Sequence, residues 1–255
     1  MKVGLQLSPR TCLATLCRAE GLEEGGDMFD LVIFDCDGVL IDSEVISARM
    51  LISELEGYGV SIDTAYVARH FLGRSYPVVL DQIQKEFGIA LPYGFEAEYR
   101  ARLMAAFEAD LKIMPGVREV IERLRVPYAL ATSSSPPRLA QSLSMVGLTD
   151  LFEGRTTTSK EVSRGKPAPD MFLLTAQKNG AAPERCLVIE DSLAGVQAGL
   201  AAGMTVWRFV GGSHLMGLDL EASAPSQAHR IFASYGDFFH SAENLMKDMS
   251  DHDAG

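Results

Sequence analysis

Two aspartates, Asp35 and Asp37, stand at the end of a short apolar run and directly before Gly38. On an extended backbone their side chains point to the same side, while the side chain of Cys36 points the other way. The glycine then lets the chain turn sharply. Paired acids in such a loop can bind a cation or simply form a turn, and the spacing alone favours the turn.

A second acidic pair, Glu190 and Asp191, follows another apolar run far along the chain. If the two runs are strands of one sheet, four carboxylates converge at its edge. Each like-charge pair at about 4 Å then costs about 4 kcal/mol at an effective dielectric of about 20, so a cation or proton uptake must relieve the repulsion. Because all four groups offer oxygen, the sequence predicts a Mg²⁺ site formed by Asp35, Asp37, Glu190 and Asp191.

Three further positions carry groups suited to a phosphate. Lys166 lies in a Gly-Lys-Pro turn, and its ammonium group suits a phosphate, although a lone loop lysine is more often solvated. Thr132 ends a predicted strand, and its hydroxyl can donate to a phosphoryl oxygen. Ser133 and Ser134 follow it, and we expect them to cap the next helix or to contact substrate through backbone N–H groups.

The elements that position these groups alternate between two periodicities. Short apolar, β-branched runs predict buried parallel strands, and amphipathic stretches between them predict helices. The predicted strands are 31–34, 128–131, 186–189 and 204–209, and the predicted helices are about 116–125, 136–146, 169–179 and 192–202. This alternation indicates an α/β protein with a doubly wound, Rossmann-like parallel-sheet core. Ligands of such sheets bind beyond the carboxyl ends of the strands, where the groups above lie.

Residues 44–111 interrupt the alternation with a mostly helical pattern. Asp63-Thr64 fits a helix start, and Gly57, Gly59, Gly73 and Gly88 fit helix ends. An all-helical block between the first two core strands indicates a small inserted cap domain, which leaves 28–43 and 112–255 as the α/β core. After Gly211 we expect a last strand and a helix from Asn244 to Met249.

Residues 1–27 precede the first strand and have no comparable pattern. Their apolar stretch is too short for a signal peptide. We expect them to be a loosely attached extension, or else Met28 to be the true start of the protein.

Composition excludes several classes of function. The chain has 255 residues, a formal net charge of −11 and 47% hydrophobic residues, with no apolar run of the roughly 18 residues that span a bilayer. The negative charge opposes binding to nucleic acid or to an anionic membrane. The four cysteines form no CxxC pair and no zinc-site spacing, as is typical of reduced thiols in the cytoplasm. We therefore expect a soluble cytoplasmic protein, a monomer or weak dimer.

Four segments, in chain order, resemble the four motifs of the haloacid dehalogenase (HAD) superfamily. They are Phe34-Asp35-Cys36-Asp37-Gly38-Val39-Leu40, Ala129-Leu130-Ala131-Thr132, Gly165-Lys166-Pro167 and Val188-Ile189-Glu190-Asp191-Ser192. The likeness extends from about residue 29 to 212, and the helical block resembles the C1-type cap of that superfamily. It is closest to the subgroup that contains 6-phosphogluconate phosphatase and β-phosphoglucomutase-like proteins.

The resemblance implies a role for each core residue. Asp35 would attack phosphorus and become an aspartyl phosphate. Asp37 would protonate the leaving oxygen and then accept a proton from water. Thr132 and Lys166 would hold the phosphoryl oxygens. Mg²⁺ would be bound by Asp35, the backbone carbonyl of Asp37 and Asp191, with Glu190 bound directly or through water.

We therefore predict a Mg²⁺-dependent phosphatase for a small phosphorylated metabolite, such as a sugar phosphate or 6-phosphogluconate. A β-phosphoglucomutase-type mutase is the alternative. Such mutases carry a cap histidine ten residues after the second aspartate, where this chain has Ser47, and their cap arginine has moved or been lost here. Dehalogenation is disfavoured, since it needs neither Mg²⁺ nor the second aspartate. A phosphoaspartate receiver or binding module is an alternative of another class, although a closing cap argues against it.

For contacts with the organic part of the substrate we expect the cap loop Gly73, Arg74 and Ser75. Arg74 could equally be a solvated surface residue. Ser43 either faces the cleft or caps the first cap helix. The two isolated histidines after the last predicted strand, His214 and His229, are expected to be surface or packing residues, and Trp207 to pack at that strand.

Overall fold

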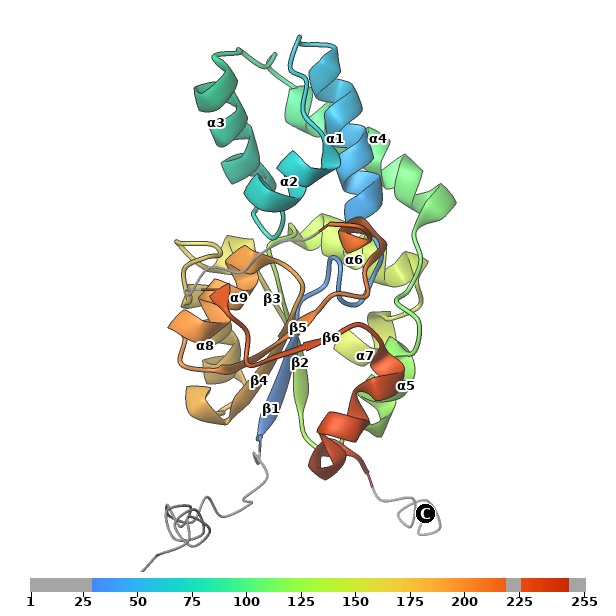
Figure 1. Ribbon diagram of the computed structural model, residues 1–255, viewed down its shortest axis with the longest axis vertical. Helices are drawn as coiled ribbons and strands as arrows, with labels where there is room; N and C mark the ends of the chain where they lie inside the picture. Colours follow the sequence, from blue (N-terminus) through green and yellow to red (C-terminus); the bar gives the residue numbers. More distant parts are fainter. Residues whose placement is uncertain (1–28, 219–225, 248–255) are drawn as a thin grey trace, which may run out of the picture.

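The computed structural model describes residues 29–218 and 226–247. The chain forms a sheet covered by helices, with a separate group of helices above one end of the sheet (Figure 1). The predicted extension 1–27, with Cys12 and Cys17, lies outside the described residues. No helix in the described ranges combines the length and the hydropathy needed to cross a bilayer.

The described residues form a six-stranded, all-parallel sheet in the order β3-β2-β1-β4-β5-β6. The strands are β1 (Leu31–Phe34), β2 (Tyr128–Thr132), β3 (Thr156–Thr158), β4 (Cys186–Glu190), β5 (Thr205–Phe209) and β6 (Arg230–Phe232). The central strand shows why the apolar runs are unbroken. Val32 and Phe34 enter one hydrophobic cluster while Leu31 and Ile33 enter another, so both faces are buried.

Helices cover both faces of the sheet (Figure 1). One side carries α5 (Val117–Arg123), α6 (Pro136–Met145) and α7 (Thr149–Phe152), and the other carries α8 (Asp170–Lys178) and α9 (Leu193–Ala201). The predicted spacing of α5 places Val117, Val120 and Ile121 in the first cluster, whereas Phe172 of α8 joins the second. The doubly wound α/β fold is thereby confirmed.

Four helices between β1 and β2 pack around a hydrophobic cluster of their own. They are α1 (Glu44–Glu56), α2 (Thr64–His70), α3 (Tyr76–Phe87) and α4 (Phe95–Asp110), and together they are called the helical unit below. The backbone N–H of Tyr66 donates to the Asp63 side chain, which caps α2 as predicted. The helical unit falls inside the stretch predicted to be a cap.

Two elements differ from expectation. Strand β3 was not predicted, because Thr156–Thr158 is short and polar and becomes a strand only through its pairing with β2. The predicted last helix is wrong in its described part, where a 3₁₀ turn ends at Leu245. The expected last strand is present as β6. Other 3₁₀ turns are Ser159–Glu161, Pro183–Arg185, Ser213–Leu215, Tyr235–Asp237 and Phe239–Ser241.

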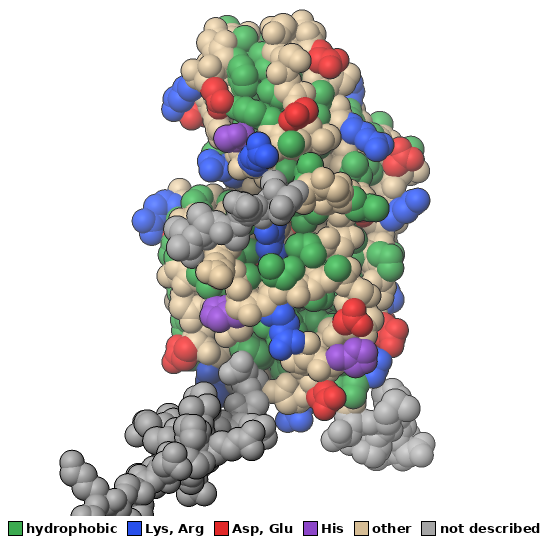
Figure 2. All heavy atoms as spheres, viewed as in Figure 1, with side chains coloured by type: hydrophobic (Ala, Val, Ile, Leu, Met, Phe, Trp, Pro, Cys, Tyr) green, Lys and Arg blue, Asp and Glu red, His purple; other side chains and the backbone are tan. Residues whose placement is uncertain are grey.

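Trp207 packs as expected, in an aromatic group with Phe232 and Phe238. Figure 2 shows one face of the molecule, on which Lys and Arg side chains are interspersed with Asp and Glu.

Candidate active site

The carboxyl ends of the three middle strands bring the predicted residues together. Asp35 follows β1 directly, Thr132 ends β2 and Glu190 ends β4. Because β1 pairs in parallel with both β2 and β4, these ends lie at the same edge of the sheet. The backbone N–H of Asp35 continues the pairing by donating to the Ile189 carbonyl at 2.9 Å.

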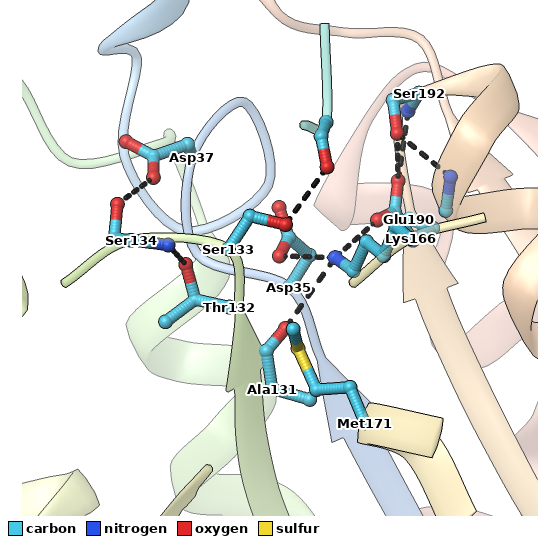
Figure 3. Close-up of polar contacts among 12 residues, drawn as sticks. Asp35, Asp37, Ala131, Thr132, Ser133, Ser134, Lys166, Met171, Glu190 and Ser192 are labelled. Atoms are coloured by element: carbon cyan, nitrogen blue, oxygen red, sulfur yellow. Dashed lines mark hydrogen bonds and ion pairs between the residues drawn. The ribbon is translucent and has the colours of Figure 1, made fainter. Parts of the chain in front are cut away.

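Lys166 connects two of these strand ends. Its Nζ lies 2.6 Å from Asp35 Oδ1 and 2.5 Å from Glu190 Oε1, and all three side chains are buried (Figure 3). Burial alone would lower the pKa of Lys166, but the two carboxylates outweigh it and hold the pKa above its usual value. Lys166 is therefore a charged, buried lysine, and the alternative of a solvated loop lysine is wrong.

Glu190 is held by the start of α9 as well as by Lys166. The backbone N–H and the hydroxyl of Ser192 both donate to Glu190 Oε2, at 2.8 and 3.0 Å. Ser192 also caps α9 by accepting from the backbone N–H of Gly195. A Cβ on Gly195 would lie 1.7 Å from Glu190 Oε1, so only glycine leaves room for this carboxylate. Both oxygens of Glu190 are thus occupied within the protein.

Asp35, Glu190 and Asp191 have oxygens within 4.8 Å of one another, and this is the group of potential metal ligands found among residues 29–218 and 226–247. Oδ2 of Asp191 is buried and has no hydrogen-bond partner in the part of the chain that the structure describes. Burial is the main cause that raises the pKa of both Asp35 and Asp191, against the opposing charge of Lys166. An all-oxygen set of three buried carboxylates this close together fits a hard divalent cation.

Asp37 has different surroundings from Asp35. Its carboxylate accepts hydrogen bonds from the hydroxyls of Ser43 and Ser134, each at 2.6 Å, and from the guanidinium of Arg138 at 2.7 Å. Burial would raise the pKa of Asp37, but Arg138 and the two hydroxyls outweigh it and lower the pKa. The Asp37 side chain lies outside the group of metal ligands, and its backbone carbonyl as a ligand stays a prediction.

The helix-capping role predicted for the serines is not found, whereas substrate contacts of Ser133 and Ser134 stay a prediction. Ser43 is fully buried, makes no side-chain cap bond and points to Asp37, so neither the cleft-facing nor the capping role predicted for it is found. Ser134 likewise binds Asp37, and its backbone N–H donates to Thr132 Oγ1. Ser133 donates to the Gly73 carbonyl at 2.8 Å (Figure 3). Helix α6 begins after Ser135 without a side-chain cap, so the predicted capping is wrong.

A cleft opens above Asp35 and Asp37, between the sheet edge and the helical unit. The loop Gly73–Ser75 lines it from the helical unit, together with Tyr76 and Arg100. Thr132, Ser133, Ser134, Arg138 and Lys160 line it from the core. The structure therefore places the predicted loop residues at the cleft, with Arg74 facing the same space as Asp35 rather than only bulk solvent.

A model of the haloacid dehalogenase-like hydrolases matches residues 29–203, more than half of the chain. The chain belongs to this family. It is 28% identical over 187 residues to 6-phosphogluconate phosphatase of Escherichia coli (strain K12), covering 72% of this chain and 84% of that protein. It is 32% identical over 183 residues to hexitol phosphatase A of the same organism, covering 68% and 80%.

Among solved structures, a HAD family hydrolase from Deinococcus radiodurans R1 with bound phosphate and sodium is 35% identical, with a TM-score of 0.67. The match covers 87% of this chain and 99% of that one. The comparisons confirm the predicted family and enzyme class, a phosphoric monoester hydrolase of the HAD type. The receiver-module alternative is therefore wrong.

Sequence reasoning missed three residues at this HAD-type site. Arg138 was not predicted as a site residue. It lies in the first turn of α6, where a positive charge is unfavourable to the helix dipole, and such a position indicates that the arginine serves a contact outside the helix. Glu44 lines the cleft, and burial, then the charges of Asp37 and Asp191, raise its pKa to about 8. His214 is not a surface residue, since its side chain is 5% exposed and lies against Asp191.

Proposed function

We propose that this protein is a Mg²⁺-dependent phosphatase that hydrolyses a small phosphorylated metabolite through an aspartyl phosphate on Asp35. The observation that carries the proposal is the position of Asp35. It accepts a hydrogen bond from Lys166, lies close to the carboxylates of Glu190 and Asp191, and lines the same cleft as Asp37.

Each step of the reaction has a group in reach. Oδ1 of Asp35 accepts from Lys166, which leaves Oδ2 to attack phosphorus. Asp37 gives a proton to the leaving oxygen and later takes one from the water that attacks the aspartyl phosphate. The hydroxyl of Thr132 and the ammonium group of Lys166 bind phosphoryl oxygens as charge moves through the transition state. Hydrolysis regenerates Asp35 and releases inorganic phosphate.

Asp35 and Asp191 would hold the metal, with Glu190 bound directly or through a water. When bound, Mg²⁺ supplies positive charge to the phosphoryl oxygens. The close approach of carboxylate oxygens from Asp35, Glu190 and Asp191, all within 4.8 Å of one another, supports this assignment.

A sugar phosphate or phosphosugar acid fits the cleft lining best. Four cationic side chains line the cleft: Arg74, Arg100, Arg138 and Lys160. Arg100 already pairs with Glu96 at 2.6 Å, whereas no ion pair within 4 Å is found for Arg74 or Lys160 among the described residues. These cations suit polyhydroxylated anions, and the two named relatives act on such compounds.

Hydrolysis is favoured over phosphoryl transfer between sugar hydroxyls. At the position where the related mutases have a histidine, Ser47 donates to the Ser43 carbonyl at 3.0 Å. A serine hydroxyl bound in this way is no general base at neutral pH.

The test is a phosphate-release screen over sugar phosphates, polyol phosphates and phosphosugar acids, with 6-phosphogluconate and glucitol 6-phosphate as a matched pair. We expect turnover with Mg²⁺, its loss in EDTA and its loss in Asp35→Asn. Asp81→Asn, an exposed carboxylate of α3, is the control. Full activity of Asp35→Asn, or no phosphate released from any substrate, would refute the proposal. Conversion of a phosphosugar to its isomer without phosphate release would establish the mutase instead.

A further inference from the structure

His214 lies beside the three carboxylates of Asp35, Glu190 and Asp191, but it belongs to none of the four HAD-like segments. It sits in the 3₁₀ turn Ser213–Leu215, which follows β5. Its Nε2 is 2.8 Å from Oδ2 of Asp191, and the side chains of both residues are almost fully buried. An imidazole at this distance from a metal-binding carboxylate is a candidate partner for that carboxylate.

Two glycines make room for the imidazole ring. A Cβ on Gly38 would lie 2.9 Å from His214 Cε1 and 2.1 Å from Asp191 Oδ2. A Cβ on Gly212 would lie 2.6 Å from the same ring carbon. Gly38 belongs to the loop of Asp35 and Asp37, so the ring is fitted against that loop and a side chain at either glycine would displace it.

The turn that carries His214 is attached to the same loop. The backbone N–H and the hydroxyl of Ser213 both donate to Asp42 Oδ1, at 3.1 and 2.9 Å. On the other side, Arg208 Nε donates to the backbone carbonyl of Asp191 at 2.9 Å. Hydrogen bonds therefore hold the backbone on both sides of the His214–Asp191 contact, whereas Oδ2 of Asp191 has no hydrogen-bond partner among the described residues.

The facing polar atoms of His214 and Asp191 lack hydrogen bonds although they are buried. Oδ2 of Asp191 and both ring nitrogens of His214 are buried without a hydrogen-bond partner among the described residues. The 2.8 Å separation is that of a hydrogen bond, but the atoms are not aligned as one. A modest rotation of either side chain satisfies two of these three atoms at once.

We propose that His214 is a positioning residue for the metal centre, whose Nε2–H donates to Oδ2 of Asp191 and directs the other oxygen of that carboxylate to the cation. The inference rests on the proposed Mg²⁺ site. His214 is not itself a ligand, because it is absent from the group whose atoms lie within 4.8 Å of one another. Partners of this kind typically change metal affinity 10- to 100-fold.

The test compares His214→Gln with His214→Asn. The amide of glutamine can occupy the place of Nε2, whereas that of asparagine reaches only the place of Nδ1. Mg²⁺ affinity is measured without substrate, from the rise in melting temperature during a MgCl₂ titration of EDTA-treated protein. We expect about a 10-fold weaker Mg²⁺ affinity in His214→Asn, and an affinity within about threefold of the parent in His214→Gln.

His214→Leu should weaken Mg²⁺ binding at least as much as His214→Asn, and His240→Leu, at an exposed turn, is the control. Equal Mg²⁺ affinity in the parent, the Asn and the Gln variants would overturn the proposal, as would equal loss in both. If the Leu variant does not fold, the Asn and Gln pair still decides. Failure of the proposed phosphatase function would show as absent turnover in the parent, whereas this inference is read from Mg²⁺ binding alone.

Discussion

Replacing Lys166 by methionine tests the electrostatic balance of the site in the metal-free protein. The ammonium group is shared by Asp35 and Glu190, whose side chains are 5% and 0% exposed. Its removal leaves two buried carboxylates without their cation. Removing one partner of a buried ion pair costs about 3–5 kcal/mol. Repulsion between two carboxylates at about 4 Å and an effective dielectric of about 20 is about 4 kcal/mol, which is the same range.

The assay is urea denaturation of the folded protein in EDTA at pH 8. We expect Lys166→Met to lower the free energy of unfolding by about 3–5 kcal/mol. With an m value of about 2–3 kcal/mol/M, the urea midpoint falls by roughly 1–2 M. The deficit should shrink as the pH is lowered to 5, because the carboxylates left behind then take up protons.

Two comparisons separate this cause from general damage. Lys166→Met/Glu190→Gln removes one of the two anions, so it should recover about half of the loss. Lys178→Met breaks an ion pair with Glu161 that is more than a third exposed, and should cost at most about 1 kcal/mol. The reasoning is refuted if Lys166→Met costs no more than Lys178→Met, or if the double variant is less stable than Lys166→Met alone.

For three further substitutions the structure predicts the direction of the change in activity or stability. Arg138→Met removes the cation that holds down the pKa of Asp37 against burial, so the alkaline limb of the kcat/KM–pH profile should move up by about one to three pH units. Gly73→Ala should lower the free energy of unfolding and should also lower kcat/KM by about 10-fold or more. The reason is that φ is +76° at this residue and the new Cβ would lie 2.1 Å from Ser192 Oγ. In the metal-free parent, ionisation of Glu44 should lower the free energy of unfolding by at most about 1.4 kcal/mol per pH unit between about pH 4.5 and 8. Glu44→Gln should remove this pH dependence.

The controls for these substitutions are also in the chain. Gly88→Ala has the same backbone problem, with φ at +63°, but its Cβ meets nothing within 4 Å, so it should cost only about 1–2 kcal/mol and leave kcat/KM unchanged. For Glu44 the sign follows because burial raises the folded pKa above the ordinary value of 4.5, so stability is fully present below pH 4.5 and declines through pH 8. Identical melting curves for Glu44→Gln and the parent at pH 5 and pH 8 would contradict this assignment.

The convergence of the acidic residues could be predicted because strand ends are local features. Asp35 and Glu190 each follow a continuous apolar run, and a parallel sheet brings the ends of such runs to one edge. The position of Lys166 in the sequence did not reveal that its side chain would lie between Asp35 and Glu190. Its burial depends on how the loop before α8 folds back over β1 and β4, which is a tertiary property.

Arg138 and His214 show the other limit of sequence reasoning. Each acts through one contact with a residue about 100 or 23 positions away, and a single pair at such separation leaves no periodic pattern. Arg138 still left a trace, since a cation in the first turn of a helix is locally unfavourable. Residues that break a local rule in this way are expected at functional sites. His214 left none, because a short turn after a strand accepts almost any residue.

The charges of the described site explain why a divalent cation suits it. Asp35, Asp37, Glu190 and Asp191 can carry four negative charges. Lys166 pairs with Asp35 and Glu190, Arg138 pairs with Asp37, and the buried Arg208 donates to the backbone carbonyl of Asp191. Glu44, with its pKa near 8, is mostly protonated at neutral pH and adds little. The carboxylates therefore outnumber the cations, and burial raises the pKa of both Asp35 and Asp191. A divalent cation bound beside these carboxylates would favour the ionised form of Asp35, which is the form that a nucleophile needs.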